Sequence, residues 1–314
     1  MTLVIDLADI RSADAHRVGA KMARLGELAA RGLRVPDGYA VTAGALADPT
    51  APALRDAVAA AHERLRNRTG RGAALTVAVR SSGVSEDGAT ASFAGQYDTY
   101  LGITGIDDVI RHIMKCRESG SAARAQAYQR RFAEAGAAGA GAGAELAVGV
   151  LELVDVRSAG VAFTLDPVTG DRDRLVVEAN WGFGESVVSG HVSPDHWVIN
   201  RASGEIRESR TGATRQWSAA DPDTGLVTLR PLPADRAGRP CLTDNEVQSV
   251  CAQATAIEAA EGCPQDVEWA IANDAAGTLF ILQHRPETGG NVRDRNAFDP
   301  VRYALRNVFK VPGA

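Results

Sequence analysis

The hydrophobic pattern predicts a chain that mixes helices and strands in its first half and is richer in strands in its second half. In the first half, the pattern predicts helices at 21–31, 51–67 and 106–133. It predicts strands at 3–7 and 75–82. Strand-like runs precede a helix at 243–260 in the second half, namely "LAVGVLELV", "AGVAFTL", "RLVVEANW" and "HWVINRASGEIRES". No regular strand–helix–strand repeat is present, so the pattern indicates an α+β fold.

One low-complexity segment separates the two halves. Residues 133–145, "AEAGAAGAGAGAE", cannot build a packed core, so we interpret them as a flexible surface loop between two lobes, with a functional hinge as the alternative. We therefore expect an N-terminal lobe at 1–135, a C-terminal lobe at 136–290 and a polar tail or linker at 291–314.

Composition and charge narrow the class of protein. With 45 % hydrophobic and 23 % charged residues the chain resembles soluble globular proteins, and a net charge of −5 argues against a protein that coats nucleic acid. Its four cysteines form no CxxC pair, which predicts reduced thiols. The opening residues do not resemble a secretion signal, and no apolar run approaches the ~18 residues of a membrane span. We expect a cytoplasmic protein without nucleic-acid or membrane partners.

An arginine stands at a strand end in the stretch "VAVRSSGVSEDGATASFAGQYDTYL". Arg80 offers a bidentate guanidinium, and the serines and glycines that follow it allow a backbone to approach phosphate oxygens closely. Ser92, Gly95 and Gln96 lie further along the same stretch. A phosphate-binding loop and an ordinary polar turn both fit this pattern. A Walker A motif occurs nowhere in the chain.

Two other polar residues follow glycines. Lys21 comes shortly after Gly19 at the start of a predicted helix, where the helix dipole disfavours a cation. A bound anion would explain this lysine, and so would plain solvation at the surface. Glu185 ends the turn "GFGE", whose glycines suit a tight turn with or without a ligand.

An acid, an amide and a guanidinium lie on two alternating runs near the end of the chain. Alternation places Gln283 and Arg285 on one face of a strand, and Glu268 lies on the run before it. A carboxylate and an amide oxygen are hard donors of the kind that Mg²⁺ accepts, and a guanidinium neutralises a phosphoryl group in transfer. A solvated sheet edge is the equally weighted alternative.

Taken together, these stretches resemble the ATP-binding domain of the phosphoenolpyruvate synthase and pyruvate phosphate dikinase family, which includes the rifampicin phosphotransferases. The resemblance extends from about Gly19 to Thr288, and its motifs occur in the family's order. The matching stretches are "VGAKMARLGEL", "VPDGYAVT", "VAVRSSGVSED", "SFAGQYDTYL", "GVAFTLDPVTGDRDRLVVEANWGFGESVVSGHVSPD" and "DVEWA…LFILQHRPET".

The resemblance implies an ATP-grasp-like fold with nucleotide held between two lobes. The family's phosphate-binding lysine and arginine fall on Lys21 and Arg80, and its phosphate-covering loop falls on Ser92 to Gln96. Its magnesium ligands fall on Glu268 and Gln283 and its catalytic arginine on Arg285, with Lys21 and Arg80 assisting catalysis. Glu185 is implied to contact the nucleotide.

The segment beside the adenine departs from the family. Where the family usually has Gln-Lys-Met-Val, this chain has Leu151, Glu152, Leu153 and Val154. The resemblance implies contacts with adenine from Glu152, Leu153 and Val154, whereas the side-chain contact of the usual glutamine is lost at Leu151.

The resemblance also implies partners. Family members continue into a domain with a phosphorylated histidine and a domain that binds the acceptor, and here no histidine follows His284. We therefore expect a module that cleaves ATP, releases AMP and passes a phosphoryl group to a carrier histidine elsewhere, for transfer to pyruvate or a small-molecule hydroxyl such as that of an antibiotic. A kinase that acts directly on a small molecule and a non-catalytic ATP-binding regulatory module are the alternatives.

Overall fold

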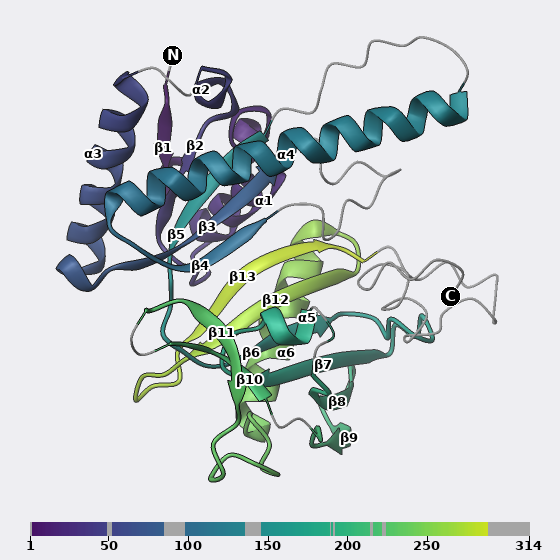
Figure 1. Ribbon diagram of the computed structural model, residues 1–314. Helices are drawn as coiled ribbons and strands as arrows, with labels where there is room; N and C mark the ends of the chain where they lie inside the picture. Colours follow the sequence, from purple (N-terminus) through teal and green to yellow (C-terminus); the bar gives the residue numbers. More distant parts are fainter. Residues whose placement is uncertain are drawn as a thin grey trace. The chain divides into compact units, whose positions relative to one another are not determined.

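The computed structural model describes residues 2–48, 52–84, 98–135, 146–188, 190, 192–213, 216–221 and 224–287, with the backbone alone at 121–135 and 188 (Figure 1). The chain forms two compact units. The first comprises Met1–Leu153 with Pro222–Leu226, and the second comprises Val154–Asp221 with Val227–Ala314. The predicted tail at 291–314 and the glycine-rich residues 136–145 lie outside the described residues.

The first unit is built on a five-stranded sheet in the order β1-β2-β5-β3-β4. Its strands are β1 (Val4–Asp6), β2 (Gly38–Val41), β3 (Thr76–Gly83), β4 (Thr99–Thr104) and β5 (Leu146–Glu152). Its helices are α1 (Ala15–Ala30), α2 (Ala43–Ala47), α3 (Pro52–Thr69) and α4 (Ile106–Ala135), with short 3₁₀ turns at Leu7–Asp9, Ser12–Asp14 and Gly72–Ala74. The pairing between its neighbouring strands is antiparallel.

Helices cover both faces of this sheet. On one face, valines of β3 and β5 form a core with buried side chains of α3 and α4, among them Leu65 and Ile113. On the other face α1 packs so closely that a Cβ atom on Gly149 would lie 2.3 Å from the sulfur of Met22. Apart from Arg80 and the strand ends, the central strands therefore carry apolar or small residues on both faces, and most of these residues are buried.

The boundary between the units lies later than the predicted one at 135/136. Strand β5 belongs to the first unit because it hydrogen-bonds to β2 on one side and to β3 on the other. The chain leaves this sheet after Glu152 and enters the second unit at Val154. The segment from Leu151 to Val154 is therefore the point at which the chain crosses from one unit to the other.

The second unit is built on a six-stranded antiparallel sheet in the order β13-β12-β6-β7-β8-β9. The strands are β6 (Val156–Phe163), β7 (Arg174–Trp181), β8 (Asp195–Asn200), β9 (Ile206–Arg210), β12 (Gln265–Ala272) and β13 (Leu279–Pro286). Helix α6 (Asp244–Glu261) buries an apolar stripe that includes Val250 and Ile257. It packs against β6, β7 and β12 on the back face, which carries the buried side chains of Trp269 and Ile271.

A two-stranded ribbon, β10 (Gln216–Ala220) and β11 (Val227–Pro231), joins the second unit beside β7 and the short helix α5 (Glu185–Val188). The guanidinium of Arg236 lies between two indole rings, 4.6 Å from the ring centroid of Trp217 and 4.9 Å from that of Trp181. Such cation–π contacts stabilise by roughly 0.5–2 kcal/mol each. They connect the ribbon to the end of β7.

These observations confirm the predicted α+β class and the predicted helices and strands, within a few residues at their ends. All four cysteines are free thiols, as predicted. Within the described ranges, no helix combines the length and the apolar character that a membrane crossing requires.

A capping box fixes the start of α6. The Glu246 carboxylate accepts hydrogen bonds from the backbone N–H and the hydroxyl of Thr243, at 2.8 and 2.9 Å, and Arg157 of β6 donates to its other oxygen at 2.5 Å. Burial of Glu246 opposes ionisation, but these hydrogen bonds outweigh it and hold the pKa below its ordinary value. The carboxylate therefore connects the helix to the sheet.

We expect Glu246→Gln to lower the free energy of unfolding by about 1–2 kcal/mol at neutral pH, because it weakens both the cap and the ion pair. A folded-state pKa that is depressed stabilises above the unfolded pKa of about 4.3, and this contribution disappears as pH falls through the folded value. Urea denaturation at pH 7 and pH 3 should show the difference from wild type shrinking in acid. Glu208→Gln, at an exposed position on β9, is the control; a difference of the same size at both pH values would contradict the assignment.

Candidate functional site

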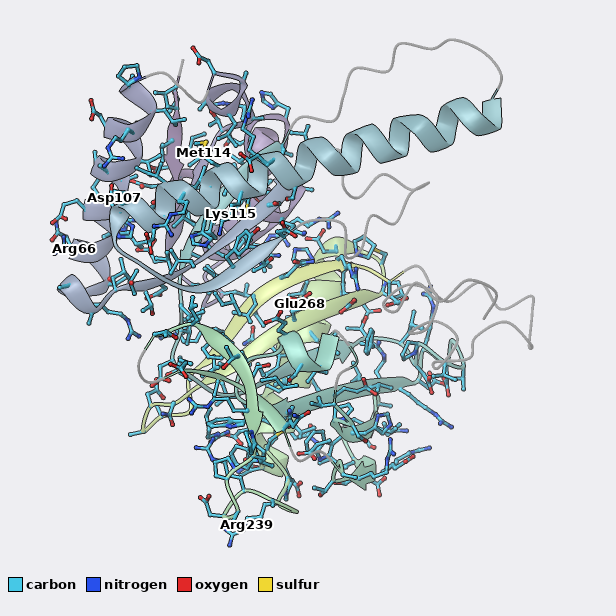
Figure 2. The ribbon with its side chains drawn as sticks, in the orientation of Figure 1. Arg66, Asp107, Met114, Lys115, Arg239 and Glu268 are labelled. Carbon is cyan, nitrogen blue, oxygen red and sulfur yellow. The ribbon has the colours of Figure 1, made fainter. Side chains whose placement is uncertain are left out.

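Four polar side chains form two cross-strand pairs on one face of the second unit's sheet. In the register of β12 and β13, Glu268 lies directly opposite Gln283, and Asp266 lies directly opposite Arg285. Residues directly opposite each other, and residues two apart on one strand, share a face of a sheet. Figure 2 labels Glu268 on β12. The predicted alternation of Gln283 and Arg285 is confirmed, and the register places Glu268 on the same face. We call this the front face, because it lies on the side of the sheet opposite to α6.

A β-bulge determines this arrangement. The register shifts between Glu268 and Trp269, so that the partner of Glu268 is Gln283 while the partner of Trp269 is Ile281. Ile281 is therefore buried on the back face with Trp269, whereas Gln283, two residues further on, lies on the front. Without the bulge Ile281 and Gln283 would share a face, because alternation along a strand has a period of two.

Asp266 and Arg285 form an ion pair in which the aspartate is buried and the arginine is partly exposed. Nε and one terminal nitrogen of Arg285 each lie 2.7 Å from Oδ2 of Asp266, which is 5 % exposed. Burial raises the pKa of Asp266 to about 6, Arg285 opposes that rise, and the Glu268 charge adds to it. Oδ1 of Asp266 has no hydrogen-bond partner among the residues that the structure describes. The ion pair therefore holds the guanidinium in one orientation at the front face.

Asp266 is a site residue that the sequence analysis missed. The available signal was its spacing, because two acids at positions i and i+2 of one strand share a face. In the sequence, Asp266 cannot be told apart from an acid at the protein surface. Only the register of β12 and β13 shows that it lies opposite Arg285.

The same front face becomes apolar beyond Glu268. Ala270 and Ala272 follow at a period of two along β12, and their partners on β6 are apolar as well. Phe183, Phe280 and Leu282 pack against this cluster. Its buried members are Val154, Val156, Ala159, Ala270 and Ala272. Along β12 the front face thus passes from an apolar floor to a carboxylate–amide pair and then to an ion pair, which suits a ligand with a flat apolar end and an anionic end.

Glu185 lies at the first position of α5, with an exposed side chain. Helix α5 packs against β6 and β7, and Ser186 approaches the front-face side chain of Asn180 at 3.5 Å between Oγ and Nδ2. Gly182 precedes the helix with φ of 75°, and a Cβ atom there would lie 2.1 Å from the carbonyl oxygen of Ser218. The glycine turn therefore has a structural reason, and it places Glu185 over the front side of the sheet.

The described side chains offer few ligands for a metal ion. No group of three or more His, Cys, Asp or Glu side chains in the described ranges could hold a metal ion. Glu268 and Gln283 offer one carboxylate and one amide oxygen. Mg²⁺ requires six oxygen ligands and usually takes most of them from water and substrate phosphates, so this pair fits Mg²⁺ that arrives with a phosphate ligand.

In the first unit, Lys21 and Arg80 lie close in the chain to a contact between α1 and β3. Gly19 interrupts α1 with φ of 77° and ψ of 162°, so Lys21 lies in the first turn of the helix that resumes, as predicted. The backbone N–H of Met22 donates to Oγ of Ser82 at 3.3 Å. Arg80 precedes Ser82 by two residues on the same face of β3. The fold thus brings the helix start that carries Lys21 to the strand end that carries Arg80.

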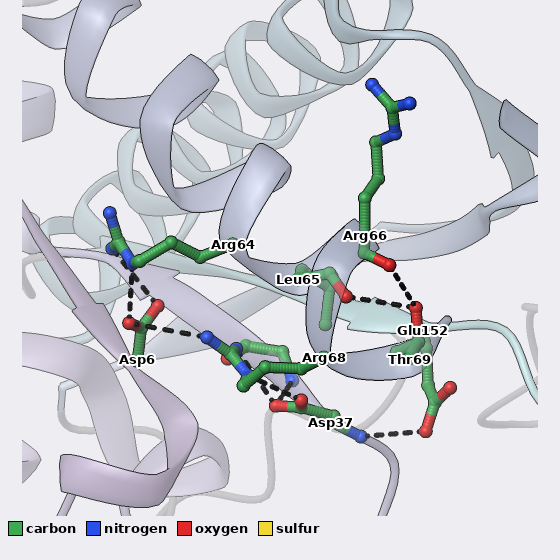
Figure 3. A network of polar contacts seen from close by, with 9 residues as sticks. Asp6, Asp37, Arg64, Leu65, Arg66, Arg68, Thr69 and Glu152 are labelled. Atoms are coloured by element: carbon green, nitrogen blue, oxygen red, sulfur yellow. Dashed lines mark hydrogen bonds and ion pairs between the residues drawn. The ribbon is translucent and has the colours of Figure 1, made fainter. Parts of the chain in front are cut away.

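A polar network occupies the segment predicted to contact adenine (Figure 3). The Glu152 carboxylate accepts a hydrogen bond from the backbone N–H of Asp37 at 3.1 Å, and Arg68 binds the Asp37 carboxylate with two nitrogens, at 2.7 and 3.1 Å. The backbone N–H groups of Glu152 and Leu153 donate to the carbonyls of Asp37 and Thr76. These groups are therefore engaged within the unit, and a contact with a base must come from other atoms of the segment.

The remaining residues of the segment predicted to lie beside the adenine, Leu151 and Val154, lie in different units. Leu151 is 4 % exposed and contributes to the interior of the first unit, whereas Val154 belongs to the apolar floor of the second. Ser92, Gly95 and Gln96 lie outside the described residues.

The chain matches a family model described as pyruvate phosphate dikinase, AMP/ATP-binding domain, over residues 46–301. It is 38 % identical to the prodigiosin synthesizing transferase PigC of Serratia marcescens, over 91 % of this chain and 33 % of that protein. It is 36 % identical to a rifampicin phosphotransferase of Streptomyces, over 91 % and 36 % of the respective lengths. A probable phosphoenolpyruvate synthase of Pyrococcus horikoshii is 37 % identical over 75 % and 28 %. The chain spans about a third of the length of these curated relatives.

We expect Arg285→Ala to destabilise the protein more than a double variant that also carries Asp266→Asn. The single change leaves a buried carboxylate unpaired, and we expect a loss of about 2–3 kcal/mol, below the value for fully buried pairs because the Arg285 side chain is 38 % exposed. Urea denaturation of both variants measures the difference. Arg55→Ala, which breaks the exposed pair with Asp107, should change stability by less than about 0.5 kcal/mol. Equal losses in the single and double variants would contradict the buried pairing.

We expect Gly19→Ala to be more damaging than Gly32→Ala. Both glycines have a positive φ, 77° and 82°, so an alanine carries backbone strain of about 1–3 kcal/mol at either position. The ψ of 162° adds to the cost at Gly19, because only glycine populates that region readily. A Cβ atom at Gly19 would lie 2.2 Å from the carbonyl oxygen of Ser82, whereas one at Gly32 meets nothing within 4 Å. Thermal denaturation should therefore show a clearly larger loss at Gly19. Equal losses would mean that α1 does not pack on β3 as described.

Proposed function

Because the chain belongs to the family of pyruvate phosphate dikinase AMP/ATP-binding domains, we propose that it binds ATP with Mg²⁺ and transfers a phosphoryl group from it. The observation that carries this proposal is the front face of β12 and β13, where an apolar floor, the Glu268–Gln283 pair and the Asp266–Arg285 pair follow one another. This sequence of surfaces matches adenine, metal and transferring phosphoryl group in that order.

The fold that we propose is ATP-grasp-like, with each unit supplying part of the contacts with ATP. In the first unit Lys21 and Arg80 contact the phosphates, together with the loop of Ser92, Gly95 and Gln96. The apolar floor of the second unit and Val154 receive the base, together with Glu152 and Leu153 at the end of the first unit's β5, and Glu185 contacts the nucleotide. The helix start at Lys21 supports this assignment, because backbone N–H groups and a lysine together favour an anion.

Glu268 and the Gln283 carbonyl would hold Mg²⁺, which neutralises phosphate charge when it is bound. The Arg285 guanidinium stabilises the negative charge of the phosphoryl group as it moves. Asp266 fixes the orientation of Arg285, so that the guanidinium need not reorganise during the reaction. Lys21 and Arg80 stabilise the charge that develops on the leaving oxygen.

The product identifies the bond that breaks. Attack by the acceptor at the β-phosphorus breaks its bond to the oxygen shared with the α-phosphate, and AMP leaves with that oxygen and its charge. The β- and γ-phosphates pass to the acceptor together, and water then releases the γ-phosphate as inorganic phosphate, so that a single phosphoryl group stays on the acceptor. Attack at the γ-phosphorus releases ADP instead. We propose the first route, with a carrier histidine on a separate domain or partner as acceptor, and with subsequent transfer to pyruvate or to a small-molecule hydroxyl. The second candidate is direct transfer from ATP to a small molecule.

We expect Glu268→Gln to weaken ATP binding about tenfold in the presence of Mg²⁺, because the metal loses a charged ligand. Without Mg²⁺ the variant should bind ATP no more weakly than wild type, because a charge that repels the phosphates is gone. Calorimetric titration with ATP, with and without Mg²⁺, measures this difference. Glu208→Gln is again the control, since it removes an exposed acid of β9. If the Mg²⁺-dependent part of the affinity survives in Glu268→Gln, the metal assignment is wrong.

A histidine-bearing carrier domain supplied with Mg²⁺ and ATP distinguishes the routes. AMP in the chromatogram supports the carrier route, and its formation should be lost in Arg285→Ala. ADP together with a phosphorylated small molecule supports direct transfer. Binding without either product would identify a non-catalytic module and refute the proposed transfer.

A further inference from the structure

We propose that His284 is a positioning residue that locks the register of β13 from the back face, so that Gln283 and Arg285 stand opposite Glu268 and Asp266. The functional meaning of this lock rests on the proposed function, but the lock itself is a statement about strand pairing. His284 lies between the two site residues of β13 and points to the opposite side of the sheet.

His284 is a buried histidine with a defined hydrogen bond. It is 2 % exposed, lies opposite Val267 in the register, and its Nδ1 is 3.0 Å from Oε1 of Gln265. Gln265 pairs with Pro286, so this bond runs diagonally between β12 and β13. It connects the two strands on the back face, while the Asp266–Arg285 ion pair connects them at the neighbouring position on the front.

Gln265 is a rigid acceptor. It is completely buried, and its Nε2 donates to the carbonyl oxygen of Cys263 at 3.0 Å, which directs Oε1 toward His284. Its backbone N–H donates to Oγ1 of Thr164 at 2.7 Å, and the Thr164 N–H donates back to its carbonyl at 2.9 Å. Because the amide oxygen can only accept, Nδ1 of His284 carries the proton in this bond. The acceptor is thus held by the residue that follows β6 and by the turn that precedes β12.

The pairing of β13 beyond the bulge requires such a lock. Only four residue pairs, from Gln265↔Pro286 to Glu268↔Gln283, lie beyond the register shift. Among the strands that the structure describes, β13 lies at the edge of the sheet and pairs with β12 alone, and Pro286 has no N–H to donate. A slip of one residue would remove the bulge and turn Gln283 and Arg285 to the back face. In that register the His284–Gln265 bond and the Arg285–Asp266 ion pair would both break.

The test compares His284→Leu, which keeps the volume and removes the hydrogen bond, with His284→Asn, whose amide nitrogen can replace Nδ1. Gln265→Met removes the acceptor without altering β13, which provides a second route if the leucine variant does not fold. His62→Leu is the matched control, because His62 is also a buried histidine (6 % exposed) but belongs to α3. The first readout is the ¹H–¹⁵N resonance of the Arg285 Nε–H group, and the second is the Mg²⁺-dependent part of ATP affinity.

We expect His284→Leu and Gln265→Met to shift or broaden the Arg285 Nε–H signal and to weaken Mg²⁺-dependent ATP binding by about 10- to 100-fold, as the loss of outer partners of a metal ligand does. His284→Asn should restore both, and His62→Leu should leave both unchanged. An unaltered Arg285 signal in His284→Leu and Gln265→Met would overturn the register lock. If the signal responds as expected while the wild-type chain shows no Mg²⁺-dependent ATP affinity, the lock stands and the proposed function fails.

Discussion

The candidate site depends on the pairing of β12 with β13 and on the bulge within it. A single extra residue at Leu282 meets two needs that regular alternation cannot meet together on β13: a buried apolar side chain beside Trp269 on the back face, and a polar side chain opposite Glu268 on the front face. Ile281 satisfies the first and Gln283 the second. Both polar pairs of the front face follow from this shift, because it determines which side chain of β13 each acid of β12 meets.

The charges on the front face have a consequence for any anionic ligand. Two carboxylates, Glu268 and Asp266, accompany one guanidinium, so the two pairs together carry a net negative charge when both acids are ionised. A polyphosphate that approaches this face alone is repelled, and a divalent cation between ligand and protein reverses the sign. Under the proposed function, the ion pair therefore contributes orientation of Arg285 and the cation contributes attraction.

Sequence reasoning reached most of the fold and part of the site. Helical spacing located α3, α4 and α6, and alternation located the strands, because these patterns reflect burial on one face of an element. It also placed Gln283 and Arg285 on one face and Lys21 at a helix start. The opposition of Asp266 to Arg285 and the membership of β5 in the first unit depend on which strands pair. Pairing between residues distant in the chain leaves no local pattern, so neither could be predicted.

The discontinuous make-up of the first unit affects how the protein matures. Its last piece, Pro222–Leu226, is separated from the rest by Val154–Asp221, which belongs to the second unit. A ribosome therefore releases this piece only after much of the second unit has been synthesised, and Gly102 of β4 receives its close neighbour Gly225 only then. The N-terminal unit therefore has all its residues only after 154–221 of its successor have been synthesised, so its completion depends on the translation of the second unit.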